Sequence, residues 1–199
     1  MKKEAQLPTI IMGYHVPNLH DQDSYVLEVI SAVLSSGKSS RFYSNLVREK
    51  KIVLSADADN SLLSHDPDLF YISAEPLPGK EVPDVENALQ TEIERLKNEP
   101  VSERELEKAK NQIEASFIYA QDSLFYQAMM LAHYEINGSW KAIDSYIPSI
   151  RKVTADDIQR VAKQYLVDEN RTVGILVPLP LKNGQGYAPG GAPMGRSLR

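Results

Sequence analysis

The feature that most constrains the fold is a change of hydrophobic period part-way along the chain. Residues 52–63 and 69–78 alternate apolar and polar side chains, and the polar turn residues 64–68 separate them. A period of two is typical of strands with one buried face, so these segments predict an antiparallel hairpin. From Val82 to Tyr165 apolar residues recur every three or four positions, which is the period of amphipathic helices.

The segment before the hairpin predicts one strand and a helix. Residues 8–16 are rich in β-branched side chains, and Pro17 ends this first strand. Residues 21–34 carry apolar side chains at helical spacing, so we expect a helix there. Asp23 or Ser24 is the expected cap, because short polar side chains accept hydrogen bonds from free backbone N–H groups.

A second helix is predicted for residues 42–50, with Ser39 or Ser40 as its cap. Gly37 is expected to end the preceding helix, since glycine adopts the left-handed conformation found there. The sequence GKSS at 37–40 lacks the upstream glycine of a phosphate-binding loop and follows a helix instead of a strand. A nucleotide site is therefore not predicted.

The long helical region divides at Pro100, which ends the helix that begins at Val82. Ser102 and Glu105 have the spacing of a capping box, in which each side chain satisfies a backbone donor at the start of a helix. The helix that follows is expected to bury a stripe of apolar residues at helical spacing: Leu106, Ala109, Ile113 and Phe117.

The rest of the chain predicts three more helices and a strand. Asp122 is expected to open one helix, residues 140–146 to form a short one, and Thr154 to cap the last. Residues 172–178 are almost all apolar, as expected for a central strand. Phe117, Tyr119, Phe125 and Tyr126 lie around one helix junction, where most are expected in the core and one or two could line a chamber wall.

Strand, two helices, hairpin, helical block and final strand together predict an α+β fold, an antiparallel or mixed sheet with helices packed on one face. Residues 1–180 are expected to form a single domain. Residues 181–199 contain too little apolar material to pack and too much glycine and proline, so they predict a disordered tail.

Composition excludes several kinds of function. The 199 residues are 42% hydrophobic and 25% charged, as in soluble globular proteins, and the net charge of -5 argues against a nucleic-acid partner. No cysteine is present, which excludes disulfides and thiolate metal sites. No apolar run reaches the ~20 residues of a membrane span. The first ten residues do not predict a signal peptide, so the signal of an exported parent is expected upstream.

Three segments carry a resemblance: GKSSRFYSNLVREKKIV, ELEKAKNQIEASF and VTADDIQRVAKQYLVDENRTVGILVP. In this order they are similar to the C-terminal half of the pitrilysin/insulinase-type zinc metallopeptidases, the superfamily that includes the mitochondrial processing peptidases. The resemblance extends over residues 8–178. It implies homologous α+β domains arranged as a clamshell around a closed chamber, with the zinc motif H-x-x-E-H on one domain and none on the facing domain.

This chain resembles the facing domain, so the resemblance implies no zinc here and a zinc site in the parent's other domain or in a partner subunit. The implied partners are that zinc-bearing domain or subunit and a peptide substrate, with no nucleic acid and no membrane span. Bacterial relatives are often exported, which favours the periplasm.

The residues themselves lead to the same expectation about zinc. Catalytic zinc needs about three protein ligands, and none of the four histidines, His15, His20, His65 and His133, has a partner at the spacing of the motif. We interpret His15 as a strand-end residue, His20 as a loop residue and His65 as part of a turn. No nucleophile elbow of a serine hydrolase is present.

The resemblance also implies a substrate-holding arginine on the second helix and a tyrosine seven residues later. The arginine matches Arg48, whereas Ser55 stands at the tyrosine position. Either this domain has lost the substrate-holding role, or a gap shifts the alignment, or the arginine–tyrosine pair belongs to a partner subunit. Arg41, Asn45 and Arg48 would share one helical stripe facing the chamber; the alternative is a solvated face with Arg48 paired to Glu49 or another carboxylate.

The sequence thus favours the non-catalytic domain of a zinc endopeptidase, which completes the substrate chamber and binds peptide. One alternative is part of an inactive scaffold subunit that pairs with a separate zinc-bearing chain, and the serine at position 55 favours it slightly. A weaker alternative is a peptide-binding module unrelated to proteolysis.

Overall fold

The computed structural model describes residues 2–4 and 7–179. A five-stranded sheet has the order β1-β5-β2-β4-β3, in which β1 pairs parallel with β5 and every other pair is antiparallel. The strands are β1 (Lys2–Glu4), β2 (Thr9–Val16), β3 (Val53–Asp59), β4 (Asp68–Pro76) and β5 (Arg171–Leu179). The hairpin of β3 and β4 and the mixed sheet are confirmed. The predicted tail, 181–199, lies outside the described residues.

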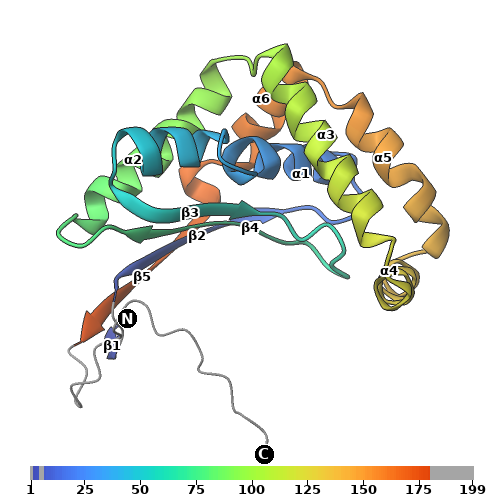
Figure 1. Cartoon of the computed structure of the whole chain (residues 1–199), viewed down its shortest axis with the longest axis horizontal. Coiled ribbons are helices and arrows are strands. Elements are labelled where there is room, and N and C mark those ends of the chain that lie inside the picture. The colour runs from blue at the N-terminus through green and yellow to red at the C-terminus, as the bar shows by residue number, and fades with distance from the viewer. Residues whose placement is uncertain (1, 5–6, 180–199) are drawn as a thin grey trace, which may run out of the picture.

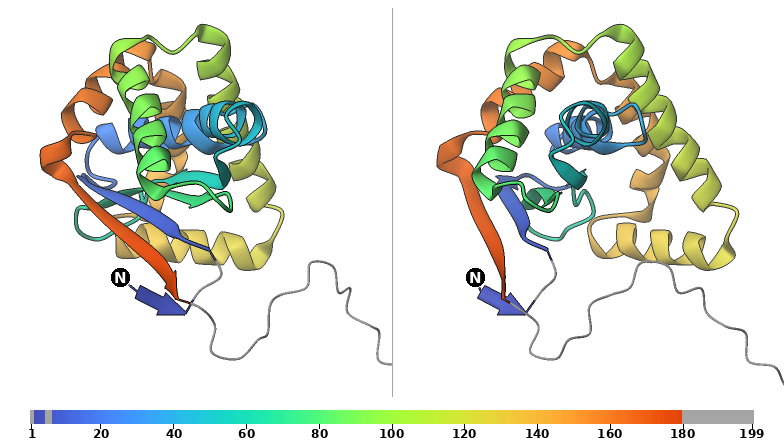
Figure 2. Two further views of the ribbon diagram at one scale, coloured as in Figure 1. Left: turned by 90° about the vertical axis from the view of Figure 1, so that its left-hand side faces the viewer. Right: turned by 60° about the vertical axis from the view of Figure 1, so that its left-hand side comes forward.

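Helices cover one face of this sheet and leave the other open (Figures 1 and 2). The α-helices are α1 (Asp23–Ser35), α2 (Val82–Asn98), α3 (Glu103–Ala120), α4 (Leu124–Ile136), α5 (Ile143–Lys152) and α6 (Ala155–Tyr165). Shorter elements are η1 (Phe42–Glu49), η2 (Trp140–Ala142) and η3 (Asp168–Asn170). The predicted α+β class, with helices on one face, is therefore confirmed. No described helix is both long enough and apolar enough to cross a bilayer.

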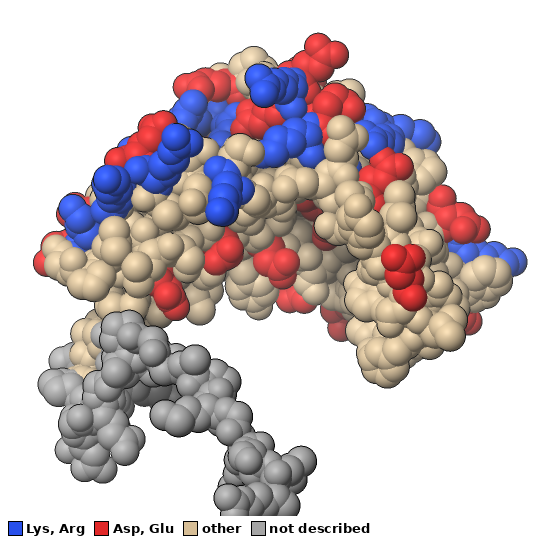
Figure 3. All heavy atoms as spheres, in the orientation of Figure 1, with Lys and Arg blue, Asp and Glu red and all other residues tan. Residues whose placement is uncertain are grey.

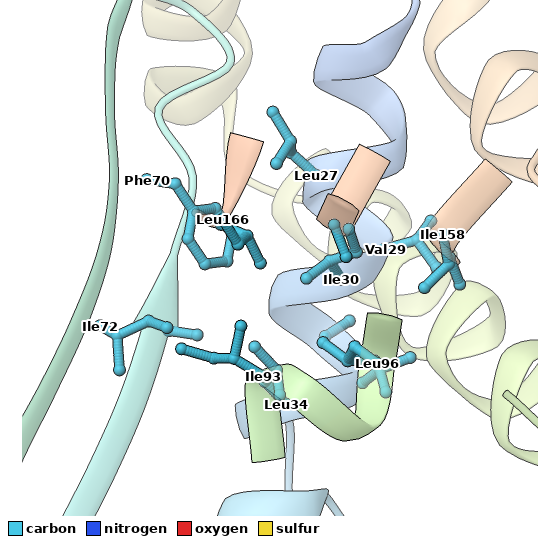
Figure 4. Close-up of a cluster of buried hydrophobic side chains, with 14 of the residues drawn as sticks. Leu27, Val29, Ile30, Leu34, Phe70, Ile72, Ile93, Leu96, Ile158 and Leu166 are labelled. Atoms are coloured by element: carbon cyan, nitrogen blue, oxygen red, sulfur yellow. The ribbon is translucent and has the colours of Figure 1, made fainter. Parts of the chain in front are cut away.

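The core lies between the sheet and the helical layer, with α1 at its centre. On β4, Phe70 and Ile72 are buried while Tyr71 between them is exposed, as the period of two requires. Figure 4 shows Phe70 directed toward side chains of the helical layer, with Leu27 of α1 and Leu166 after α6 close by. This packing fixes the sheet against α1, and it therefore also fixes the positions of the side chains on β3 and β4.

The predicted caps of α1 are wrong, because both side chains make tertiary contacts instead. Gln22 occupies the cap position without a side-chain bond. Asp23 accepts two hydrogen bonds from the guanidinium of Arg160, at 2.7 and 3.1 Å. The Ser24 hydroxyl donates to the Pro17 carbonyl at 2.9 Å. The two residues therefore tie α1 to α6 and to the end of β2.

The second predicted helix forms as η1, but it is a π-helix and neither predicted serine caps it. Its cap position is Arg41, and the Ser40 hydroxyl is buried without a partner among the described residues. The Lys50 N–H donates to the Asn45 carbonyl five residues earlier, the bond that defines a π-helix. Gly37 has φ +76°, which confirms its predicted role after the end of α1.

The capping predictions for the later helices are partly confirmed. Ser102 caps α3, but the capping box is incomplete because the Glu105 side chain pairs with another residue. Ser123, and not Asp122, caps α4 by accepting from the Tyr126 N–H. Thr154 caps α6 as predicted and forms a full box with Asp157.

Two further expectations for the helical block are corrected. The short helix predicted at 140–146 extends to Lys152 as η2 and α5, because Pro148 removes one backbone donor without ending the helix. The aromatic residues at the α3–α4 junction are mostly outside the core: Tyr119 is 75% and Phe125 76% exposed. The reason is that α4 projects beyond the sheet (Figure 1), so these rings find no core to enter.

Candidate functional site

Arg48 lies near the end of η1 with an exposed side chain. It makes no hydrogen bond or ion pair with any other described residue, so the alternative in which Glu49 neutralises it is not observed. A guanidinium without an internal partner offers a planar fork of donors to an external carbonyl or carboxylate. The geometry therefore leaves Arg48 available.

The predicted stripe of Arg41, Asn45 and Arg48 does not form a common surface. Arg41 turns inward and donates two hydrogen bonds to Glu105 of α3, at 2.8 and 3.0 Å, with its guanidinium largely buried. Because η1 is a π-helix, its residues also advance around the axis by a smaller angle than the α-helical spacing assumes. Arg41 is therefore a structural link between η1 and α3.

Ser55 lies on β3, immediately after an irregularity in the pairing with β4 between Val53 and Ser55. It is half-buried, opposite Glu75, and η1 packs against this strand. The segment 50–52 connects η1 directly to β3, so Arg48 and Ser55 are carried on adjoining elements. A serine hydroxyl reaches far less than a phenol, so this position cannot supply a tyrosine's contact.

The open face of the sheet carries polar groups that sequence analysis did not single out. Asp57 and Asp59 follow Ser55 at a spacing of two, and their partners on β4 are Ser73 and Tyr71. Asp57, Asp59 and Glu75 are exposed and make no ion pair among the described residues. In Figure 3 basic side chains gather over the helical layer, while the charged groups along the lower side are acidic. The alternation in LSADAD (residues 54–59) already indicated that Ser55, Asp57 and Asp59 share one face of the strand.

β3 is an edge strand, and among the described elements it pairs with β4 alone. Two hydroxyls of α1, those of Ser31 and Ser35, donate to the Ala58 carbonyl at 2.8 and 3.0 Å. These bonds satisfy one acceptor, and edge strands elsewhere present free backbone groups to an extended chain. The β3 edge, the open sheet face and Arg48 together make up the candidate functional site.

A zinc ion does not fit the residues that the structure describes. His15 is on β2, His20 precedes α1, His65 is in the β3–β4 loop and His133 is on α4. Within residues 2–4 and 7–179, no three His, Asp or Glu side chains come together as a metal-binding group. Catalytic zinc needs about three such ligands, so no metal chemistry is derived for this chain.

One acidic residue on the helical side was missed, although its sequence signal is plain. Glu28 interrupts the apolar run of α1 and has a half-buried side chain. Burial raises the pKa of its carboxyl to about 7, and a hydrogen bond from Asn60 partly offsets the effect of burial. Asn60 Nδ2 donates to Glu28 Oε1 at 3.0 Å. Ionisable groups with perturbed pKa values cluster at functional sites, so Glu28 is a candidate for binding or chemistry.

Fold and site define the class first: an α+β domain with one open sheet face and, in its described part, no metal-binding group. Known proteins then identify the family. The Peptidase M16 inactive domain family matches residues 1–113, more than half of the chain, and the chain belongs to this family. The resemblance seen in the sequence is thereby confirmed. Membership in an inactive-domain family is consistent with the prediction that this chain holds no zinc of its own.

Three similar proteins illustrate the relationship. The zinc protease PqqE of Helicobacter pylori is 28% identical over 177 residues, which cover 89% of this chain and 40% of that protein. The solved structure of a protease from Helicobacter pylori has a TM-score of 0.83 at 27% identity, over 89% of this chain and 43% of that one. An inactive peptidase domain from Bordetella parapertussis shares the fold, with a TM-score of 0.79 at 24% identity, over 94% of this chain and 99% of that chain.

The chain spans 40% of the length of the curated relatives that it matches, both of which are described as zinc proteases of bacteria. The family places this chain among metallopeptidase-type domains as an inactive one.

Proposed function

We propose that this chain is the zinc-free half of a bacterial zinc endopeptidase. It pairs with a zinc-bearing domain or subunit of the same family, and the two enclose a chamber in which peptide is cleaved. The observation that carries the proposal is the alignment with 40% of a zinc protease, combined with a described set of side chains that cannot hold zinc. The function therefore requires a second, metal-bearing body.

Within that chamber we assign peptide binding to the surface formed by Arg48, the β3 edge and the open sheet face. An extended peptide can pair main chain to main chain with an edge strand. The exposed guanidinium of Arg48 has no internal partner and can donate to a peptide carbonyl. Asp57, Asp59 and Glu75 favour substrates with a basic residue near the same strand.

One observation favours the second candidate, an inactive scaffold subunit. Ser55 stands where the family resemblance implies a tyrosine, so half of the implied substrate-holding pair is absent. A scaffold would retain the pairing surface and lose hydrolysis. Hydrolysis by the chain paired with a zinc-bearing domain separates the two candidates.

The test is reconstitution of hydrolysis on a quenched-fluorescence peptide of unstructured, mixed composition. The chain alone is expected to cleave nothing, with or without added zinc. Together with the family's zinc-bearing domain from the same source, fused or as a separate chain, it is expected to form a complex with chelator-sensitive activity. Hydrolysis by the chain alone would refute the proposal. A stable complex without hydrolysis, formed with a zinc-bearing domain that does hold its metal, would support the scaffold.

Arg48→Ala is expected to lower kcat/KM of the reconstituted enzyme about 10- to 100-fold, which corresponds to the roughly 1.5–3 kcal/mol of a hydrogen bond to a charged group. Arg48→Lys should restore part of the loss, because an ammonium keeps the charge and loses the fork. The matched control is Arg104→Ala, which removes an exposed arginine from the start of α3. Equal kcat/KM values for Arg48→Ala and Arg104→Ala would show that Arg48 does not contact the substrate.

A further inference from the structure

A cavity of about 690 Å³ opens between α1, α3, α4, α5 and the loop that follows β3. It has the size of pockets that hold one small molecule or one long side chain. Glu28 is its one carboxyl group, and among its described lining residues there is no lysine or arginine. The cavity lies on the helical side of the domain, so it is separate from the proposed peptide-binding surface.

The Glu28 carboxyl is held in place by neutral groups. Asn60 Nδ2 donates to it at 3.0 Å, and Tyr146 also hydrogen-bonds to its side chain. Neither donor carries a charge, so the negative charge of Glu28 is fixed in direction without being neutralised. The Oδ1 atom of Asn60 is itself buried and accepts no hydrogen bond from a described residue. The cavity therefore offers a ligand a free acceptor atom, Asn60 Oδ1, beside the negative charge of Glu28, which no lysine or arginine of the described lining neutralises.

The rest of the lining suits the apolar part of a cationic ligand. Tyr134 and Tyr146 present aromatic rings, and Tyr146 is in contact with Phe117, whose ring centroid lies 5.1 Å away. Aromatic faces attract ammonium and guanidinium groups within about 6 Å of the ring centre. Ile113 and Met130 supply aliphatic surface for a hydrocarbon stem. An anionic ligand would be repelled by Glu28.

We propose that this cavity is a binding site for an organic cation with a short aliphatic stem, with Glu28 as its counter-ion. The ligand is a primary ammonium or guanidinium group, carried either by a lysine or arginine side chain of a polypeptide or by a free amine. The inference goes beyond the proposed peptidase function, since it requires neither zinc nor cleavage.

Binding is tested by NMR titration of the chain labelled in its methionine methyl groups, with Met130 as the reporter inside the cavity. The probes are Nα-acetyl-lysine amide, n-butylamine and the neutral analogue Nα-acetyl-norleucine amide. At pH 8 the lysine probe is expected to bind at least about tenfold more tightly than the norleucine probe, as one charge-assisted contact provides. Tighter binding of Nα-acetyl-lysine amide would indicate a polypeptide side chain as the ligand, and tighter binding of n-butylamine would indicate a free amine.

Affinity is expected to be about tenfold weaker at pH 6 than at pH 8, because the Glu28 carboxyl, with its pKa raised to about 7 by burial, is then mostly protonated. Glu28→Gln should abolish both the tenfold preference and this pH dependence. Asp156→Asn is the matched control, since Asp156 is an exposed carboxylate on α6 that does not line the cavity, and it should leave the preference and the pH dependence unchanged. Burial raises the pKa of Tyr134 and of Tyr146, so both stay neutral in this range. His133→Gln is measured as well, because His133 also lines the cavity.

Three results would overturn the proposal. Equal affinity for the lysine and norleucine probes would show that charge is not recognised. The absence of a saturable shift at Met130 with either cationic probe would show that the cavity does not take this ligand. An undiminished preference in the folded Glu28→Gln variant, whose melting is followed by circular dichroism, would show that another group is the counter-ion.

Discussion

Replacing Glu28 by glutamine is expected to stabilise the free domain by up to about 3 kcal/mol at pH 8 and to change its stability little below pH 4.5. Burial raises the pKa of this carboxyl from 4.5 to about 7, and one pKa unit corresponds to about 1.4 kcal/mol. Glutamine keeps the shape of the protonated acid and its bond to Asn60. It removes the cost of a partly buried charge.

The sign follows from where each state holds the proton. Below pH 4.5 Glu28 is protonated in both the folded and the unfolded chain, so its contribution is fully present. Between 4.5 and about 7 the unfolded chain has lost the proton while the folded chain keeps it, so stability falls as pH rises through the folded pKa. Above about 7 the difference between wild type and variant is greatest.

Urea unfolding of wild type and Glu28→Gln across this pH range measures the effect. Glu75→Gln is the control, because Glu75 is an exposed carboxylate on the open sheet face and has no ion-pair partner among the described residues. Its stability profile should run parallel to that of wild type. Should the Glu28→Gln profile run parallel as well, the carboxyl is not perturbed in solution. A cation bound in the cavity should shrink the difference at pH 8.

Phe70→Ala is expected to destabilise the domain by about 3–5 kcal/mol, because it removes a large ring from a closely packed core. Phe70 is 0% exposed on β4 and faces the helical layer (Figure 4). Tyr71→Ala is the matched control one residue later on the same strand. Tyr71 is 39% exposed on the open face, so its truncation should cost about 1 kcal/mol or less.

Chemical denaturation of both variants measures the two free energies of unfolding. The prediction concerns the difference between neighbouring residues, which removes any general effect of losing an aromatic ring from β4. Similar losses of unfolding free energy for Phe70→Ala and Tyr71→Ala would mean that the open face of the sheet is also covered in the isolated chain. Such a result would also argue against an open surface available to peptide.

The fold could be predicted from the sequence wherever one periodicity was dominant. The alternating run that ends in LSADAD and the apolar strand 172–178 both appear in the sheet, and Gly37 ends α1 as expected. The predictions of helix caps failed where the expected capping side chain makes a tertiary contact instead. Asp23 has the character of a cap, yet a guanidinium 137 residues away offers it a stronger, charge-assisted contact.

The candidate site was harder to predict, because its members are brought together by the fold. The resemblance identified Arg48 and Ser55, and their role in peptide binding stays a prediction. Arg41 was grouped with Asn45 and Arg48 on α-helical spacing, which a π-helix does not follow. Glu28 and Asn60 lie far apart in sequence and meet only when α1 packs beside the end of β3. No local pattern could reveal that pair.

The position of β5 has a consequence for how the chain can be made and divided. This last strand inserts between β1 and β2, and Arg160 just before it neutralises Asp23 near the start of the chain. During synthesis the sheet cannot close until residues 171–179 have left the ribosome. A fragment that stops at residue 113 would leave β2 without one neighbour and Asp23 without its counter-charge. The stretch on which the family is recognised is thus shorter than the smallest piece able to close this sheet.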